Sequence, residues 1–163
     1  MDKQLQHHHA SRNAFMLALR VSKAPSASPA QHAAAAVPAA PLRVLIADDD
    51  RDGARILGTL LQLEGYEVRM VHGGQEALDA ARQLKPDVVL LDIGMPKVTG
   101  YDVARRLRQR YGRDCPVLIA VTAWKQASDR ILADLAGFDH HVAKPYDPAE
   151  LVRLLAKVRP AVP

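Results

Sequence analysis

The stretch that decides the fold is residues 86–100, which read Pro86-Asp87-Val88-Val89-Leu90-Leu91-Asp92-Ile93-Gly94-Met95-Pro96-Lys97-Val98-Thr99-Gly100. A proline turn leads into four consecutive apolar residues, and the run stops at the carboxylate of Asp92. A short, unbroken apolar run is typical of a strand buried on both faces, as in a parallel sheet covered by helices. Asp92 is therefore expected at the carboxyl end of a strand, where open α/β sheets bind ligands. An aspartate that only opens a loop or caps a helix would give the same local pattern.

Apolar runs and helix-period segments alternate on both sides of this stretch. Further strands are predicted at residues 44–47, 66–71, 116–121 and 141–143, and helices at residues 74–84, 100–111 and 128–136. Gly65 should end a helix that buries Ile56, Leu57, Leu60 and Leu61, and Asp147 should cap a last helix that buries Leu151, Leu154, Leu155 and Val158. This alternation predicts an α/β fold, a flavodoxin-like doubly wound sheet of five parallel strands in the order 2-1-3-4-5 with five helices.

Residues 1–41 differ in composition from the rest of the chain. They hold three adjacent histidines and an Ala/Pro-rich run with few large apolar side chains. Such a segment buries too little apolar surface to offset its ordering entropy, so we expect a disordered extension or linker. The folded domain is then expected to span residues 42–160.

Charge and cysteine content limit the possible partners and compartments. Of the 22 basic residues four lie in residues 1–41 with one acid, which leaves 18 basic and 17 acidic residues in the remainder. The near balance gives no reason to expect nucleic-acid binding. The single Cys115 excludes an internal disulfide, and no apolar run approaches the roughly 20 residues of a membrane span. We expect a cytoplasmic protein without membrane attachment.

Reactive side chains follow every predicted strand except the second. They are Asp48, Asp49 and Asp50 after the first strand, Asp92 after the third, Thr122 after the fourth and Lys144 after the fifth. In the predicted order the first and third strands are neighbours, so Asp48, Asp49 and Asp92 should converge. Carboxylates a few ångströms apart repel by roughly 1 kcal/mol per pair even in water. Mg²⁺, which prefers a few carboxylates and phosphoryl oxygens, is the simplest compensating group, and the site suits phosphoryl transfer onto Asp92.

Four motifs together resemble the receiver domain of two-component response regulators, of the type also found in hybrid histidine kinases. The motifs are residues 44–50, residues 91–96 with Gly100, residues 120–123, and Lys144-Pro145. The resemblance implies that Asp92 is the phosphoacceptor, that Asp49 binds Mg²⁺ directly, and that Asp48 acts through water or orients the other ligands. It also implies a backbone carbonyl ligand from Gly94, a switch hydroxyl on Thr122, and a salt bridge from Lys144 to the phosphoryl group, with a cis bond before Pro145. Asp50 is expected to cap the first helix.

Two positions depart from the pattern of the family. His141 stands where many members have Tyr or Phe as a rotating switch; it is either a half-buried surface histidine or a smaller switch that responds to pH. Trp124 stands where a residue can admit or shield the hydrolytic water. Together with Gly94, which has no side chain, Trp124 should leave that water unpositioned, so self-dephosphorylation should be slow.

The resemblance implies a function in phosphorelay signalling and no enzymatic turnover. The domain would take a phosphoryl group from a histidine kinase or a histidine phosphotransfer protein and signal by conformational switching. The expected partner surface comprises the fourth helix, the fifth strand and the fifth helix, including His140, His141 and Tyr146. A single-domain response regulator is expected, and the alternative is the C-terminal receiver of a hybrid histidine kinase, which the run at residues 137–141 resembles. A flavodoxin, an aspartate-nucleophile phosphatase and a non-phosphorylated adaptor match the residues less well.

Overall fold

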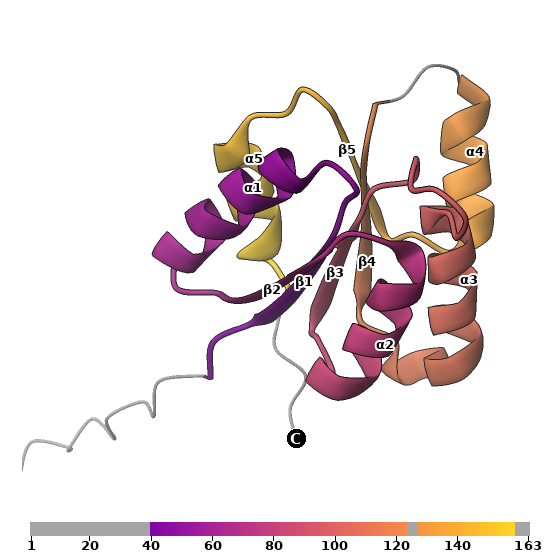
Figure 1. The fold of residues 1–163 in the computed structure, drawn as a ribbon, viewed down its shortest axis with the longest axis horizontal. Coiled ribbons are helices and arrows are strands. Elements are labelled where there is room, and N and C mark those ends of the chain that lie inside the picture. Colours follow the sequence, from indigo (N-terminus) through magenta and orange to yellow (C-terminus); the bar gives the residue numbers. More distant parts are fainter. Residues whose placement is uncertain (1–39, 124–126, 159–163) are drawn as a thin grey trace, which may run out of the picture. The chain divides into compact units, whose positions relative to one another are not determined.

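A computed structural model describes residues 40–123 and 127–158, and the sheet that it contains has the predicted order. Five strands lie side by side as β2-β1-β3-β4-β5, and each neighbouring pair is parallel (Figure 1). The strands are β1 Arg43–Ala47, β2 Glu67–Val71, β3 Val88–Leu91, β4 Val117–Thr122 and β5 His140–Ala143. The prediction of a flavodoxin-like doubly wound sheet is confirmed, and the strand limits differ from those predicted by one residue at most.

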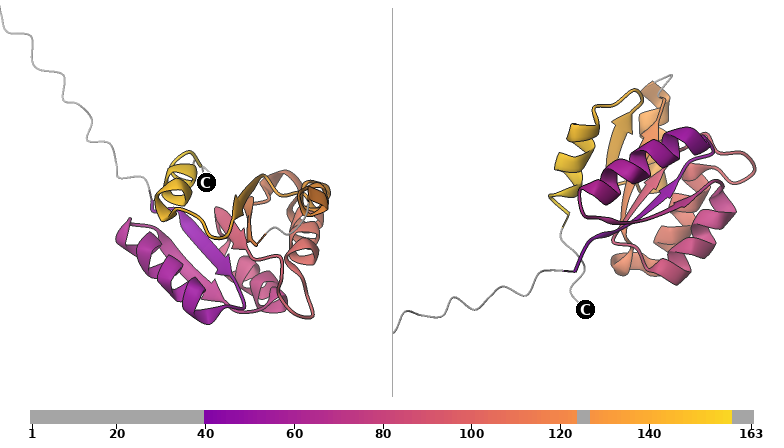
Figure 2. Two further views of the ribbon diagram at one scale, coloured as in Figure 1. Left: turned by 90° about the horizontal axis from the view of Figure 1, so that it is seen from above. Right: turned by 60° about the vertical axis from the view of Figure 1, so that its left-hand side comes forward.

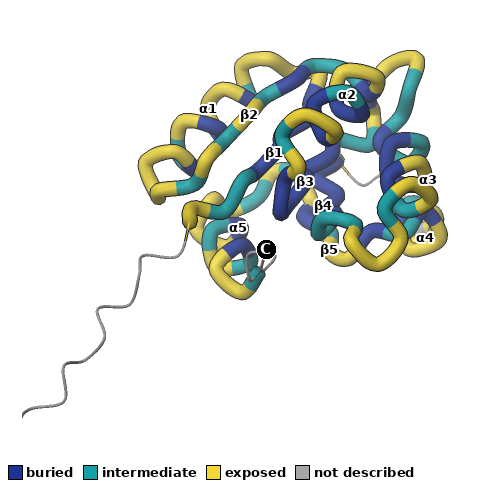
Figure 3. The backbone as a smooth tube through the Cα atoms, turned by 90° about the horizontal axis from the view of Figure 1, so that it is seen from below, coloured by how far each residue is buried: buried dark blue, intermediate teal, exposed yellow. Residues whose placement is uncertain are grey.

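The helices form one layer on each side of the sheet. They are α1 Arg51–Leu63, α2 Gly74–Leu84, α3 Gly100–Tyr111, α4 Ala127–Ala136 and α5 Pro148–Leu155, with a 3₁₀ turn η1 at Gly112–Asp114. Helices α1 and α5 cover one face, and α2, α3 and α4 cover the other (Figures 1 and 2). Burial is concentrated in the central strands β1, β3 and β4 between these layers, whereas the solvent-facing sides of the helices are exposed (Figure 3).

Alternation along the strands divides the core in two. In β1, Val44 and Ile46 pack toward α1 and α5, whereas Leu45 and Ala47 pack toward the opposite helices. Successive side chains of a strand point to opposite faces, so the unbroken apolar runs supply both cores at once. This double burial explains why β1, β3 and β4 lack the polar alternation of a one-sided sheet, which the edge strand β2 shows at Glu67–Val71.

Side-chain caps fix where three of the helices begin. The Asp50 carboxylate accepts hydrogen bonds from the backbone N–H groups of residues 52 and 53 at the start of α1, as predicted. Thr99 and Asp102 form a reciprocal capping box at the start of α3. Asp147 caps α5, whose first residue is Pro148, also as predicted. Each such cap satisfies N–H groups that have no partner within the helix.

One predicted core position, Ile56, is wrong, and one predicted helical position, Val158, lies outside its helix. Ile56 is 71% exposed, because the face of α1 that meets the sheet carries Leu57 and Leu61 instead. At about 100° per residue, Ile56 lies about 140° around the helix from Leu61 and therefore points to solvent. Val158 lies beyond the end of α5, although it packs partly buried against the same core as Leu151 and Leu155.

No helix among residues 40–123 and 127–158 is long and apolar enough to cross a lipid bilayer. The predicted extension at residues 1–41 lies almost entirely outside the described residues, as does Trp124.

Candidate functional site

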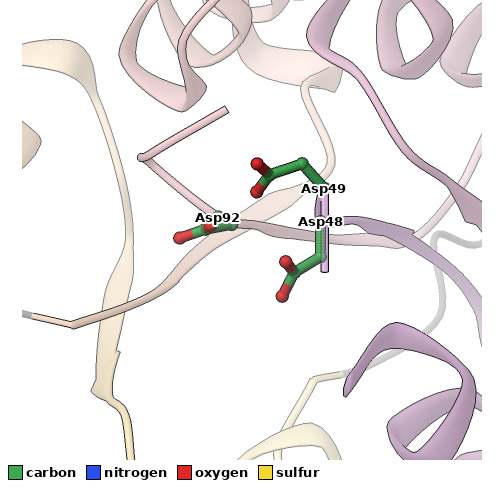
Figure 4. A group of neighbouring side chains, drawn as sticks. All are labelled: Asp48, Asp49 and Asp92. Atoms are coloured by element: carbon green, nitrogen blue, oxygen red, sulfur yellow. The ribbon is translucent and has the colours of Figure 1, made fainter. Parts of the chain in front are cut away.

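The register of β1 and β3 places the acidic residues side by side. Ala47 of β1 pairs with Leu91 of β3, so the residues that follow, Asp48 and Asp92, leave the sheet together. The Asp92 backbone N–H donates to the Ala47 carbonyl at 2.8 Å. The carboxylates of Asp48, Asp49 and Asp92 extend from this point toward one region (Figure 4), and each offers an oxygen atom within 4.8 Å of the others. The predicted convergence therefore occurs.

Lys144, which follows β5, reaches back to the same group of acids. Its Nζ lies 2.6 Å from Oδ2 of Asp48 and 3.9 Å from Oδ2 of Asp92. The peptide bond between Lys144 and Pro145 is cis, as predicted. Lys144 thus links the loops after β1, β3 and β5. The closest partner of Lys144 is Asp48 and not Asp92, the predicted phosphoacceptor. The Lys144 ammonium therefore lies near Asp92 but makes its shorter ion pair with Asp48.

Burial and the surrounding charges determine the protonation of these groups. Burial raises the pKa of Asp92, and the charge of Asp48 raises it further. The charge of Lys144 and hydrogen bonds from the Gly94 backbone N–H and the Thr122 side chain oppose this rise in pKa but do not cancel it. Burial alone would lower the pKa of Lys144, yet its hydrogen bond to Asp48 and the nearby carboxylates raise it overall. The raised pKa of Lys144 keeps its ammonium protonated, and the raised pKa of Asp92 means that its carboxylate is harder to ionise than that of an ordinary aspartate.

The donor set fits Mg²⁺. Three carboxylates and one ammonium leave an excess of two negative charges, which a divalent cation would balance. Mg²⁺ prefers oxygen ligands and is usually held by one or two carboxylates together with waters and phosphoryl oxygens. Asp48, Asp49 and Asp92, which each offer an oxygen within 4.8 Å of the others, are the residues that would hold it. Asp49 is exposed and Asp48 is buried, 7% exposed, and the direct and indirect roles expected for them stay predictions.

Thr122 and Gly100 shape the surroundings of Asp92. Thr122 is the last residue of β4, is only 8% exposed, and hydrogen-bonds through its side chain to Asp92. Gly100 begins α3 against the loop that follows Asp92. A Cβ at Gly100 would lie 2.5 Å from the Asp92 carbonyl oxygen, so only glycine permits this close approach. The backbone of α3 therefore supports the loop that carries the acid.

Gly94 contacts the site through its backbone. Its N–H donates to Asp92, and a Cβ at this position would lie 3.6 Å from Oδ2 of Asp92, an ordinary contact distance. The exposed Gly94 thus lies beside Asp92, with which it was predicted to share the metal ion. A metal bond from its carbonyl stays a prediction.

His72 is a site neighbour that the sequence analysis missed. It follows β2 directly, and its Nδ1 lies 3.1 Å from the Asp48 backbone oxygen. The expectation that the second strand leaves no reactive group at its carboxyl end is therefore wrong. The signal was present, since His72 occupies on β2 the position that Asp48 occupies on β1. The His72 ring supports the backbone of Asp48 and does not join the carboxylates.

Three further residues were predicted for the switch and the partner face, namely His141, Tyr146 and Trp124. His141 is half-buried on β5, with Nε2 2.7 Å from Oδ1 of Asp134 on α4 and its ring beside that of Phe138. Tyr146 is half-buried against the core beneath α1 and α5, and burial raises its pKa. His141 therefore bridges β5 and α4. Trp124 is not among the described residues.

Comparisons with known proteins agree on one family. A family model, the response regulator receiver domain, matches residues 44–156. Response regulator MprA of Mycolicibacterium vanbaalenii is 40% identical over 119 residues, which cover 73% of this chain and 49% of that protein. DNA-binding response regulator MtrA of Mycolicibacterium smegmatis is 40% identical over 118 residues, which cover 72% and 50%. The chain thus spans about half the length of these curated relatives.

Solved structures give the same result. The chemotaxis protein CheY4 of Vibrio cholerae superposes with a TM-score of 0.69 at 27% identity, covering 74% of this chain and all of that one. A putative response regulator of Chloroflexus aurantiacus superposes with a TM-score of 0.68 at 34% identity, covering 72% and 97%.

Proposed function

This chain belongs to the response regulator receiver domain family, and we propose on that basis that Asp92 accepts a phosphoryl group from a phosphohistidine. The donor would be a histidine kinase or a histidine phosphotransfer protein. The observation that carries the proposal is the meeting of Asp48, Asp49 and Asp92 within 4.8 Å, with the Lys144 ammonium 3.9 Å from Asp92. A metal-binding acidic cluster that only stabilises the fold would not need a lysine shared between two of its acids.

The chemistry asks little of the protein beyond position and charge. An Asp92 carboxylate oxygen would attack phosphorus as the phosphorus–nitrogen bond to the donor imidazole breaks. No general base is needed, because the acceptor is already an anion when it reacts. Bound Mg²⁺ would supply positive charge against the transferring oxygens. Lys144 would pair with the new phosphoryl group, and Asp48 would hold Lys144 in place. The domain stores the group and performs no further reaction, so we propose that it is not an enzyme with its own substrate.

Phosphorylation would be transmitted through Thr122 toward α4. The modification adds nearly two negative charges and new acceptor oxygens at Asp92. The Thr122 hydroxyl, now bonded to the Asp92 carboxylate, would shift to the phosphoryl oxygens and draw the end of β4 with it. Helix α4 begins only five residues further on, and the His141–Asp134 contact joins it to β5. We therefore propose that the arrangement of α4 against β5 reports the phosphorylated state.

The proposed partner surface is the face formed by α4, β5 and α5. A groove of about 1060 Å³ runs along it between charged residues that include Arg130, Glu150 and Arg153. Ile131 and Leu135 on α4 are 61% and 76% exposed. Exposed apolar side chains beside mixed charges are typical of protein–protein contacts. A downstream protein bound here would respond directly to movement of α4.

Incubation with acetyl phosphate and Mg²⁺, followed by intact mass spectrometry, tests the proposed acceptor. We expect the mass to rise by one phosphoryl group in the wild type and in Asp114→Asn, a substitution of an exposed aspartate at the other end of the sheet. We expect no gain in Asp92→Asn or when EDTA removes the metal. Continuous release of phosphate without a mass gain would instead identify a phosphatase and would overturn the proposal.

Two molecular settings are compatible with this chemistry. In the first the domain is a single-domain response regulator in the cytoplasm; in the second it is the receiver of a hybrid histidine kinase. We propose the first, with the second as its alternative. The full open reading frame separates them, because a hybrid kinase would encode the kinase domains on the same polypeptide.

A further inference from the structure

A second cavity lies at the amino ends of the strands, opposite to the acidic site at their carboxyl ends. Its volume is about 500 Å³, within the range of small-molecule sites. Its wall includes Arg43, which begins β1, together with Pro86 and Pro116, which precede β3 and β4. The last turns of α2 and α3 complete it. Asp92 follows the carboxyl end of β3, so this cavity at the amino ends is separate from the phosphoacceptor.

Positive charge predominates in the lining of this cavity. The charged lining residues are Arg43, Arg82, Lys85, Asp87, Arg110 and Asp114. Asp87 is buried, but the Arg43 backbone N–H donates to its Oδ2 at 2.8 Å, and the Arg43 guanidinium lies 3.3 Å from both of its oxygens. This local pairing neutralises Asp87, so the buried carboxylate does not repel an anion.

Two of the cations have no ion pair among residues 40–123 and 127–158. Lys85 and Arg110 lack a carboxylate oxygen within 4.0 Å, whereas Arg82 is paired with Asp79 at 2.9 Å. Lys85 also ends α2 in the left-handed conformation, with φ of 48°. A non-glycine residue in that conformation costs about 1 kcal/mol. The chain thus places a lysine at the cavity in a conformation that glycine would adopt more easily.

The cavity also offers flat apolar surface. The ring of Tyr111 is half-buried, and the guanidinium carbon of Arg110 lies 5.8 Å from its centroid. Pro86 is buried and Pro116 half-buried beside it. Aromatic and proline rings favour a planar ligand, and lysine and arginine favour phosphate or carboxylate oxygens. A ligand that has both a planar ring and an anionic group would contact the rings and the cations of this cavity together.

We propose that this cavity binds a small planar organic anion of the nucleoside monophosphate class. Lys85 and Arg110 bind its phosphate, and Tyr111 with the two prolines contacts its base. Binding here does not depend on phosphorylation of Asp92, because the two sites lie at opposite ends of the strands.

Calorimetric titration of the full chain with AMP, adenosine and inorganic phosphate tests this site. We expect saturable AMP binding that is at least tenfold tighter than that of adenosine or phosphate alone. Lys85→Asn, which keeps a residue tolerant of the left-handed conformation, and Arg110→Gln should each weaken AMP binding about tenfold, the effect of losing about 1.4 kcal/mol. Arg106→Gln, on the same helix but outside the cavity, should leave the affinity unchanged.

Phosphorylation of Asp92 by acetyl phosphate provides the check that each variant is folded. Absence of saturable AMP binding to the wild type would overturn the proposal. Equal AMP affinity in the wild type and in both cavity variants would also overturn it, as would equal affinity for AMP and inorganic phosphate. A failure of Asp92 phosphorylation in the wild type would instead contradict the function proposed for the acidic site and would not bear on this one.

Discussion

Replacing Asp92 by asparagine should make the metal-free protein more stable. The acids Asp48, Asp49 and Asp92 offer oxygens within 4.8 Å of one another, and each pair at that distance repels by about 0.9 kcal/mol in water and about 3.5 kcal/mol at an effective dielectric of 20. Asp92→Asn removes two such repulsions and one attraction, to Lys144 at 3.9 Å. The net gain in the free energy of unfolding is about 0.7 kcal/mol at the dielectric of water and about 2.7 kcal/mol at an effective dielectric of 20. A gain of about 1 kcal/mol raises the melting temperature by about 4 °C.

The direction of the pH dependence follows from the raised pKa of Asp92. A carboxyl whose pKa is higher in the folded than in the unfolded state binds its proton more tightly when folded. The wild type therefore gains stability relative to Asp92→Asn as the pH falls through the folded pKa, and the difference between the two proteins closes near the ordinary aspartate pKa of about 4. Above the folded pKa the destabilisation by the ionised acid is complete.

Thermal unfolding of the two proteins in EDTA, from pH 7 down to pH 4, measures this difference. Added Mg²⁺ should reverse the order at pH 7, because an ion at 100 times its Kd stabilises the wild type by about 2.7 kcal/mol and binds the variant less well. Asp114→Asn serves as the control for loss of an exposed negative charge. An Asp92→Asn variant that is less stable than the wild type in EDTA at pH 7, or a difference that does not change with pH, would refute the reasoning.

Two further substitutions test the supports of the site. Lys144→Met should reduce the free energy of unfolding by about 2 kcal/mol in urea denaturation, because it leaves Asp48 buried without its 2.6 Å cationic partner, and it should slow phosphorylation; an unchanged midpoint would show that the ion pair contributes nothing. Gly100→Ala should cost about 1–3 kcal/mol and impair phosphorylation, since the new Cβ meets the Asp92 carbonyl oxygen at 2.5 Å; normal stability with normal phosphorylation would contradict the close approach.

The sheet and the acidic cluster were predictable because both depend on strand order. Once β1 and β3 are neighbours, the residues after Ala47 and Leu91 must emerge together. Helix limits were predictable where a side chain sets them, as at Asp50 and Asp147. The buried face of α1 was harder to predict. Four apolar residues were expected to share one buried face, but the side of α1 that contacts the sheet carries Leu57 and Leu61 and not Ile56.

Pairings between distant side chains escaped prediction. The ion pairs Arg43–Asp87 and Arg108–Asp139 join distant segments of the chain. The fold determines that these segments are neighbours, but it does not determine which of their side chains form an ion pair. Lys144 was expected near Asp92, yet it lies closer to Asp48, because the distance of a flexible side chain to two adjacent acids is set by local packing. Strand order specifies which backbones meet, and rotamers then decide which charges pair.

Mapping the modified residue tests the central claim most directly. The wild type would be phosphorylated with acetyl phosphate and Mg²⁺, treated with borohydride to reduce the acyl phosphate to homoserine, and analysed by peptide mass spectrometry. The account predicts homoserine at position 92 and nowhere else. Homoserine at position 48 or 49, or no homoserine at position 92 in a sample that carries phosphate, would contradict it.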